Sequence, residues 1–178
     1  MRAQEICDFV LAESRGEGAT DTVVAVSETD EVMIRFSNNE ITVTKDLRET
    51  MVSVFVMVNE RRAGTEIVDI SKRGLKTATR RAVMEAKNSP SGGIYAPLPE
   101  GPFPYSSELL DQGEVDLSPD SIISHVEEAI SAGLEEGARR MAGSLVAKNL
   151  RLTLQTSGQV FGVAHKPSIE LSIRALED

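Results

Sequence analysis

Aromatic residues and cysteine are scarce in this sequence. It contains no tryptophan, and aromatic residues make up 4% of the chain, which argues against a stacking platform for single-stranded nucleic acid. The one cysteine, Cys7, cannot form a disulfide within the chain. Because Cys7 lies in line with Ile6 and Val10 on one face of a predicted helix, we interpret it as a core residue rather than a reactive thiol.

Positive charge and long apolar runs are also lacking. The formal net charge is −9 and the isoelectric point is near 4.8, so a general affinity for nucleic-acid phosphates is not expected. No apolar run approaches the roughly 18 residues that a membrane-spanning helix needs. The N-terminus has the pattern of an amphipathic helix and not that of a secretion signal. We therefore expect a cytoplasmic protein with no nucleic-acid partner and no membrane partner.

Histidine is rare, with His125 and His165 the only two in the chain. His125 and Glu128 have an i,i+3 spacing that can share a metal, but both lie on the polar side of a predicted helix, so we interpret them as a solvated face. His165 falls within a predicted strand, as a surface or edge residue. We predict no catalytic residue and no metal site in this chain. A small hydrolase with its own metal at His125 and Glu128 stays open as an outlying alternative.

What the chain does contain is an ordinary globular composition, 40% hydrophobic and 26% charged. Periodicity predicts a helix over residues 2–15 and short strands over 21–28, 32–36 and 41–44. The turn between the last two strands, at Asn38 and Asn39, is interpreted as a polar hairpin, with a substrate contact as the alternative.

The chain is organised around residues 50–90. A strand over 50–58 is apolar on both faces, which predicts that it is covered on both sides near the middle of a sheet. A second strand follows over 65–70. Ser71 then predicts the start of a helix by accepting a bond from a free backbone N–H, and Pro90 forbids its continuation.

The second half of the chain begins with a segment rich in proline. Five of the seven prolines fall between residues 89 and 105, which predicts extended, irregular chain. Ser91-Gly92-Gly93 lacks the Lys-Ser/Thr of a phosphate-binding loop, so we interpret it as linker. Ser118-Pro119-Asp120 predicts the start of a long helix, in which Gly133 and Gly137 indicate tight packing. Three alternating strands are predicted over 150–155, 160–165 and 169–173, with Lys166-Pro167 breaking the chain between the last two.

These elements predict an α+β fold with helices packed on a mostly antiparallel sheet, followed by a linker, a long helix and a three-strand β-meander. The predicted domains are an N-terminal α+β domain over 1–90, a proline-rich linker over 91–117, and the helix with its meander over 118–178.

Charge is distributed unevenly along the chain. Basic residues crowd the helix after Ser71, whereas no Lys or Arg occurs between Asn88 and Gly137, where acidic residues dominate. One interpretation is two solvated faces. The other is that the acidic region meets the basic helix, in the same chain or in a second subunit. The candidate interface residues are Lys76, Arg80 and Arg81.

Three stretches of the sequence resemble a known family. They read N-x-R-R-x-G…D-I-S…G-L…A-x-R-R-A-V-x-x-A-K-x-S-P from Asn59 to Pro90, R-F-S-N-N-E-I from Arg35 to Ile41, and S-G-Q-V-F-G…S-I-E-L-S-I-R-A from Ser157 onwards. In this order and spacing they resemble the N-terminal region and the start of the middle region of the TldD/PmbA family. That family was named as modulators of DNA gyrase and is now regarded as metallopeptidases. Its proteins are much longer than this chain.

The resemblance carries expectations about the whole protein. It implies a cytoplasmic zinc metallopeptidase acting on peptides or unfolded segments, or the non-catalytic partner of one, as a homodimer or as a heterodimer with a related member. The zinc would be held by two histidines on a helix in a C-terminal region that this chain lacks. This portion would shape the substrate passage and the subunit interface without a cofactor of its own. The alternative is a free-standing protein-interaction domain with no peptidase role.

Overall fold

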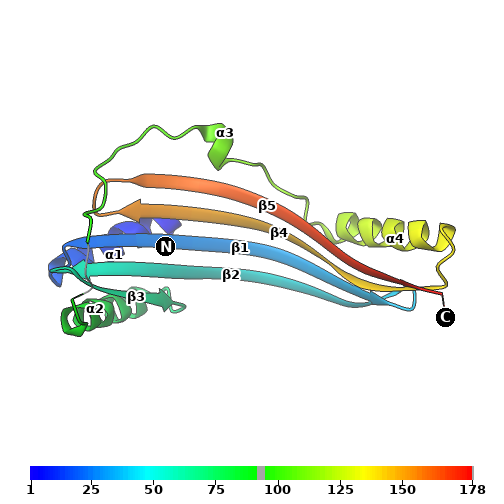
Figure 1. Cartoon of the computed structure of the whole chain (residues 1–178), viewed down its shortest axis with the longest axis horizontal. Helices are drawn as coiled ribbons and strands as arrows, with labels where there is room; N and C mark the ends of the chain where they lie inside the picture. Colours follow the sequence, from blue (N-terminus) through cyan, green and yellow to red (C-terminus); the bar gives the residue numbers. More distant parts are fainter. Residues whose placement is uncertain (92–94, 178) are drawn as a thin grey trace. The chain divides into compact units, whose positions relative to one another are not determined.

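The structure is a computed structural model that describes residues 1–91 and 95–177. Its helices and strands run in the order α1 (Ala3–Gly16), β1 (Asp21–Ser37), β2 (Glu40–Val58), β3 (Arg61–Ile67), α2 (Lys72–Asn88), α3 (Ser107–Leu110), α4 (Pro119–Glu135), β4 (Arg140–Thr156) and β5 (Phe161–Leu176). The strands form one five-stranded antiparallel sheet in the order β3-β2-β1-β4-β5 (Figure 1). The predicted α+β class, with helices on a mostly antiparallel sheet, is confirmed.

The strands are longer and fewer than the sequence predicts. Strand β1 joins the predicted strands at 21–28 and 32–36, β2 joins those at 41–44 and 50–58, and β5 joins those at 160–165 and 169–173. In β1 the buried residues keep even numbers from Thr22 to Phe36. Because this alternation stays in phase, the polar pair Asp30-Glu31 is carried within a continuous strand instead of turning the chain.

The predicted break at Pro167 is wrong, because Pro167 lies within the continuous strand β5. Strand β5 is an edge of the sheet, with β4 as its one neighbouring strand. Proline is tolerated in edge strands because one side of such a strand has no ladder to which its missing N–H would contribute.

The chain divides into two compact units. Unit 1 comprises Met1–Glu28, Thr50–Leu110 and Arg151–Ala164, and unit 2 comprises Thr29–Glu49, Asp111–Leu150 and His165–Asp178. The boundaries pass through four of the strands, so neither unit is a continuous stretch of chain. They do not coincide with the predicted boundaries at residues 90 and 118.

Unit 1 has a core in which α1 and α2 pack on the same face of the sheet. The buried residues come from α1 (Ala3, Ile6, Cys7 and Val10), from α2 (Leu75, Ala82, Val83 and Ala86) and from the even-numbered valines of β1 and β2. The start of α2 is as predicted, since the Ser71 hydroxyl accepts a 3.1 Å hydrogen bond from the Gly74 N–H.

The other face of the sheet in unit 1 differs from the prediction. Along β2 the even-numbered valines are buried. On the opposite face Met51, Ser53 and Phe55 are half-buried, and Met57 is buried. Strand β2 does lie inside the sheet, between β3 and β1. Neither core cluster of the described residues includes Met51, Ser53 or Phe55, so the second apolar face of this strand is covered only in part.

Unit 2 has its own core, built around α4. Ile122, Val126 and Ile130 pack with Ile34, Phe36 and Leu145 of the strands. The helix starts at Pro119 as predicted, but Ser118 makes no side-chain cap. Its hydroxyl donates to the Asp116 carboxylate at 2.8 Å instead. Gly133 lies against Met141, whose side chain would overlap an added Cβ, which confirms tight packing at that glycine.

Candidate functional site

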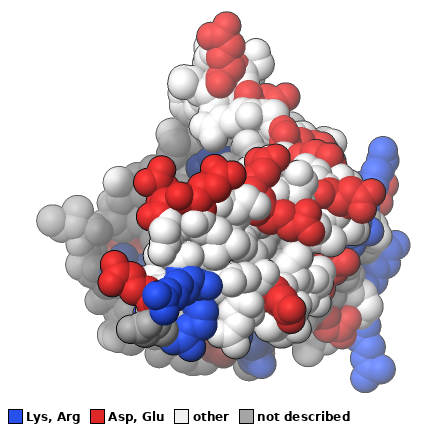
Figure 2. Space-filling model, turned by 90° about the vertical axis from the view of Figure 1, so that its right-hand side faces the viewer, with Lys and Arg blue, Asp and Glu red and all other residues white. Residues whose placement is uncertain are grey.

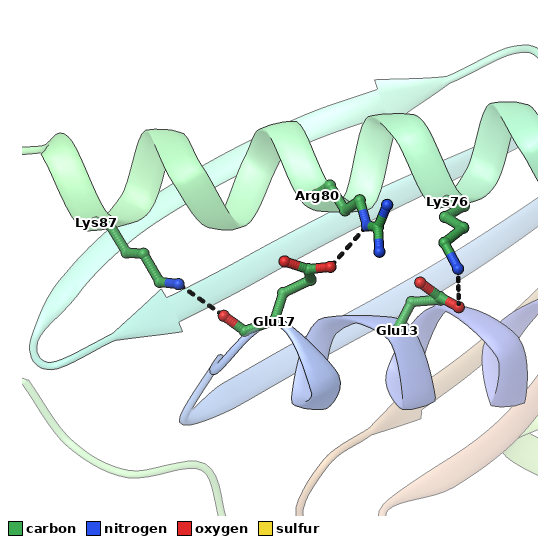
Figure 3. A network of polar contacts seen from close by, with 5 residues as sticks. All are labelled: Glu13, Glu17, Lys76, Arg80 and Lys87. Carbon is green, nitrogen blue, oxygen red and sulfur yellow. Dashed lines mark hydrogen bonds and ion pairs between the residues drawn. The ribbon is translucent and has the colours of Figure 1, made fainter.

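The predicted interface residues lie on α2, and two of them bind α1 (Figure 3). The Lys76 ammonium lies 3.3 Å from the Glu13 carboxylate, and the Arg80 Nε donates to Glu17 at 2.6 Å. Lys87 adds a 2.7 Å hydrogen bond to the Glu17 carbonyl. The basic face of α2 is therefore paired with acids of its own unit.

Arg81 differs from these neighbours. Its described ion pair is with Glu85 on the same helix, at 3.6 Å. Since both side chains are more than half exposed, such a pair contributes little to stability. The Arg81 charge is exposed on the surface. Its substitution would not break an ion pair with α1, so Arg81 is the best of the three residues with which to test an interface.

A shallow depression lies beside Arg81 on the outer side of α2. Its lining combines an apolar side chain with charged and amide groups: Thr77, Arg80, Arg81, Met84, Glu85, Asn88 and Ser89. Met84 is 61% exposed. Methionine and arginine are both enriched at protein interfaces.

The exposed face of α4 is acidic. Asp and Glu side chains gather on the face of the molecule where α4 lies (Figure 2). Those exposed on this helix and directly after it are Asp120, Glu127, Glu128, Glu135 and Glu136. His125 is half exposed, with its Nδ1 3.9 Å from the Glu128 carboxylate, so both lie on a solvated face as predicted.

The described residues offer no ligand set for a metal. No group of three His, Cys, Asp or Glu side chains comes together in residues 1–91 and 95–177. His165 lies on the edge strand, as predicted, 3.9 Å from the Asp111 carboxylate. These two groups fall short of the three protein ligands of a catalytic zinc, so no zinc step is assigned to this chain.

The asparagine hairpin between β1 and β2 is held by hydrogen bonds to another segment of the same chain. Asn39 has a φ of 67°. Its amide oxygen accepts from the Met141 N–H at 2.7 Å, and its amide nitrogen donates to the Arg139 carbonyl at 3.1 Å. Because both ends of the amide bind the backbone of β4 or the residue before it, this side chain is structural, which supports the hairpin interpretation.

A second asparagine amide binds the segment before α4. The Asn149 side chain accepts from the Val115 N–H and donates to the Val115 carbonyl, each at 2.8 Å. A single side chain thereby replaces a neighbouring strand for this stretch of backbone. Sequence reasoning did not find this role, because it depends on a contact 34 residues away.

Sequence reasoning also missed an apolar pocket in unit 1. The pocket has a volume of about 170 Å³, and its lining residues are Tyr105, Leu110, Leu152, Leu154, Val160, Gly162, Val163 and Ala164. The alternation of Leu152 and Leu154 with Arg151 and Thr153 marks their face of β4 in the sequence. The segment before α4 supplies Tyr105 and, from the short helix α3, Leu110, and no sequence pattern locates that segment against the sheet.

Three further predictions concern single features. Cys7 is fully buried, and this burial, reinforced by the charge of Asp8, raises the pKa of its thiol to about 11. Such a thiol is an inert core residue. Gly92 and Gly93 lie outside the described residues, so the linker interpretation there stays a prediction. Among the described residues, no helix is both long enough and apolar enough to cross a bilayer.

Comparisons with known proteins find solved structures of the same fold. A candidate modulator of DNA gyrase from Bacteroides thetaiotaomicron is 14% identical, with a TM-score of 0.75 over 96% of this chain and 40% of that chain. TldE from Thermococcus kodakarensis is 16% identical, with a TM-score of 0.69 over 96% of this chain and 39% of that chain. A candidate gyrase modulator from Thermotoga maritima is 13% identical, with a TM-score of 0.73 over 94% and 38% of the two chains.

Sequence comparison gives no such match: no protein-family model fits the chain, and no curated protein matches it. At 13–16% identity, the similarity to solved structures is one of fold. The chain spans about 40% of the length of the structures that it matches. It therefore has the fold of the matched part of these TldE and candidate gyrase-modulator proteins.

Proposed function

We propose that this chain is the N-terminal and middle portion of a TldD/PmbA-like protein. That protein would be a cytoplasmic zinc metallopeptidase acting on peptides or unfolded segments, or the non-catalytic partner of such an enzyme. The portion described here shapes the substrate passage and the subunit interface. In this proposal the described residues hold no metal, and bond cleavage takes place in another part of the protein.

One observation carries this proposal. The fold similarity covers 94–96% of the chain but only 38–40% of each matched protein. A further part of comparable or greater length would then supply the catalytic groups. The sequence motifs of Asn59–Pro90 and of the Asn38-Asn39 hairpin support the same assignment independently of the fold.

The surfaces of the chain suit a supporting role. The second face of the sheet in unit 1 carries half-buried Met51 and Phe55, which leaves apolar area for another part of the protein or for a partner to cover. The outer side of α2 presents Met84 beside Arg81. The proposed partner is a second copy or a related family member.

The experiment that tests the peptidase role uses the longest polypeptide that the gene encodes. It measures zinc content and cleavage of an unfolded casein substrate, alone and mixed with a related family member, with and without a chelator. We expect stoichiometric zinc and chelator-sensitive cleavage in at least one of these mixtures. A reading frame that ends at Asp178, with neither zinc nor cleavage in any mixture, would establish the free-standing interaction domain instead.

The interface role has a separate test. Arg81→Glu should weaken association in a salt-sensitive way, measured by sedimentation velocity at low and high salt. Arg73→Glu, on the same helix, serves as the matched charge-reversal control. Association that is unchanged by Arg81→Glu at every salt concentration would remove α2 from the interface.

A further inference from the structure

The apolar pocket of unit 1 contains a glycine that the chain itself does not require. Gly162 lies within β5, in a backbone conformation open to any residue. A Cβ added there would meet no atom within 4 Å. Glycine within a strand weakens it, and it often marks a place where a ligand or another backbone approaches closely.

The rest of the lining is apolar. Leu152 and Leu154 project from the face of β4 opposite to Arg151 and Thr153, because side chains alternate along a strand. Arg151 and Thr153 line a surface together with Ala3 of α1, so the pocket opens on the face of the sheet away from that helix. Val160 and Ala164 add further apolar wall.

The open side of the pocket is bordered by the segment before α4. Tyr105 and Leu110 line the pocket from this segment, and Tyr105 is 51% exposed. Phe103 contacts the Tyr105 ring edge-on, with ring centroids 6.4 Å apart, and is 43% exposed. In a chain with two tyrosines and five phenylalanines, two exposed aromatic residues beside one apolar pocket form a binding surface.

Acidic residues neighbour the lining residues along the segment before α4, whereas exposed Lys166 follows Ala164 by two residues in β5. Glu108 lies between Tyr105 and Leu110 along the chain and is exposed, and Glu100 lies earlier in the same segment. No Lys or Arg occurs between Asn88 and Gly137. An apolar floor with acidic groups at its edge complements an apolar side chain that is flanked by basic residues.

We propose that this pocket binds one aromatic or large aliphatic side chain of an extended peptide segment that carries lysine or arginine next to it. A comparable apolar cavity of about 150 Å³ accommodates benzene, so the pocket of about 170 Å³ takes a phenylalanine ring. The inference rests on the proposed peptide-handling role and names its substrate class. The pocket selects apolar-basic segments before any cleavage takes place.

The test is an NMR titration of the 178-residue chain with a seven-residue peptide, in which one phenylalanine lies between two lysines in a glycine–serine background. We expect the amide signals of Gly162 and Ala164 to shift. Replacement of the peptide's phenylalanine by alanine should weaken binding about tenfold or more, as the burial of one large apolar side chain predicts. Replacement of the peptide's lysines by glutamates should also weaken binding, and this loss of affinity should be larger at low salt than at high salt.

Gly162→Val fills the pocket and favours the strand, so it should abolish these shifts without lowering the melting temperature. Gly64→Val is the matched control, because Gly64 lies exposed in β3, where an added Cβ makes an ordinary 3.7 Å contact with the Val54 carbonyl. The control should bind as the wild type does. Gly162→Ala should give an intermediate loss of peptide binding. It tests the same prediction if the valine variant misfolds.

Three outcomes would overturn the proposal. In the first, the phenylalanine and alanine peptides bind equally well. In the second, Gly162→Val binds the peptide as the wild type does. In the third, the chain self-associates and Gly162→Val removes this association, which would assign the pocket to a second copy. The titration requires neither zinc nor cleavage. A failure here leaves the peptidase proposal standing, and a failure of the zinc and cleavage test leaves this result unaffected.

Discussion

The two units cover their share of the sheet in different ways. In unit 1 two helices, α1 and α2, pack on one face and are joined to each other by ion pairs. In unit 2 a single helix, α4, covers the strands, and two asparagine amides bind backbone groups. Asn39 of the hairpin binds the backbone of Met141 and Arg139, and Asn149 binds the backbone of Val115 before α4. Side-chain hydrogen bonds to the backbone also occur in unit 1, as between Lys87 and the Glu17 carbonyl, so the two units differ chiefly in the number of helices that cover the sheet.

The largest expected effect comes from opening either core. Leu75 of α2 and Ile122 of α4 are both fully buried, so replacement by alanine should lower the free energy of unfolding by about 2–5 kcal/mol in each case. Urea unfolding measures this loss. Hydrogen exchange should show it chiefly in α1 and α2 for Leu75→Ala, and in α4 for Ile122→Ala.

Met84→Ala is the control for these core variants, because Met84 is exposed, and its effect should stay within about 0.5 kcal/mol. Equal loss of amide protection in all three helices for both core variants would show that the two units unfold together. The two units would then differ in their structure but not in their stability.

The second prediction concerns the asparagine bonds of unit 2. Asn39→Gly keeps a residue that accepts the positive φ but removes both amide bonds to the backbone, which should cost about 1–3 kcal/mol. Asn38→Gly is the matched control, since Asn38 has a φ of 52° and its side chain makes no hydrogen bond within the described residues. Similar losses in the two variants would mean that backbone conformation matters here and the amide bonds do not.

The third prediction concerns pH and the buried thiol of unit 1. Burial raises the pKa of Cys7 to about 11, above the value of 9.0 for an unperturbed thiol. Between these values the folded chain keeps a proton that the unfolded chain has lost, so the free energy of unfolding should fall as pH rises from about 9 to about 11. Urea midpoints across this range measure the slope.

Cys7→Ala should lack this part of the slope, although the variant is less stable at every pH. A thiol-specific reagent should also react with Cys7 only as fast as the protein unfolds. Rapid modification of the native protein at pH 8 would show that the thiol is accessible and that the pKa is not raised.

The smallest expected effect belongs to the ion pairs between α1 and α2. A double-mutant cycle with Glu17→Gln and Arg80→Gln should give a coupling of about 0.2–1 kcal/mol, because the pair is partly exposed. High salt should reduce it. Arg81→Gln is the control, and its coupling to Glu17 should be zero within error; a coupling as large as that of Arg80 would mean that general charge, not the pair, is measured.

Local signals in the sequence predicted the three long helices well. The apolar spacing along α1 and α2, the Ser71 cap and the start at Pro119 depend on residues within one or two turns of one another. The same local signals predicted two short strands in place of each of β1, β2 and β5. Asp30-Glu31 and Pro167 are turn or break signals when taken alone, but alternation in phase and an edge position allow the strand to continue.

The candidate surfaces were predicted only in part. Within unit 1, Lys76 and Arg80 of α2 pair with Glu13 and Glu17, which no local pattern indicates. A contact of the basic helix with the acidic region after Asn88 stays a prediction. No local sequence pattern assigns a role to Gly162. Its significance depends on the empty space that an added Cβ would meet and on the position of Tyr105 and Leu110, which come from the segment before α4.

By itself, the sequence determined the class of fold, the helices and the face that each helix buries, because these follow from the local periodicity of apolar side chains. The tertiary structure alone decided which strands are continuous, which polar groups bind each other and where a pocket opens. These outcomes depend on residues that are distant in the chain, and such contacts form only when the strands pair. The bond between Asn39 and Met141, 102 residues apart, is one that no local pattern contains.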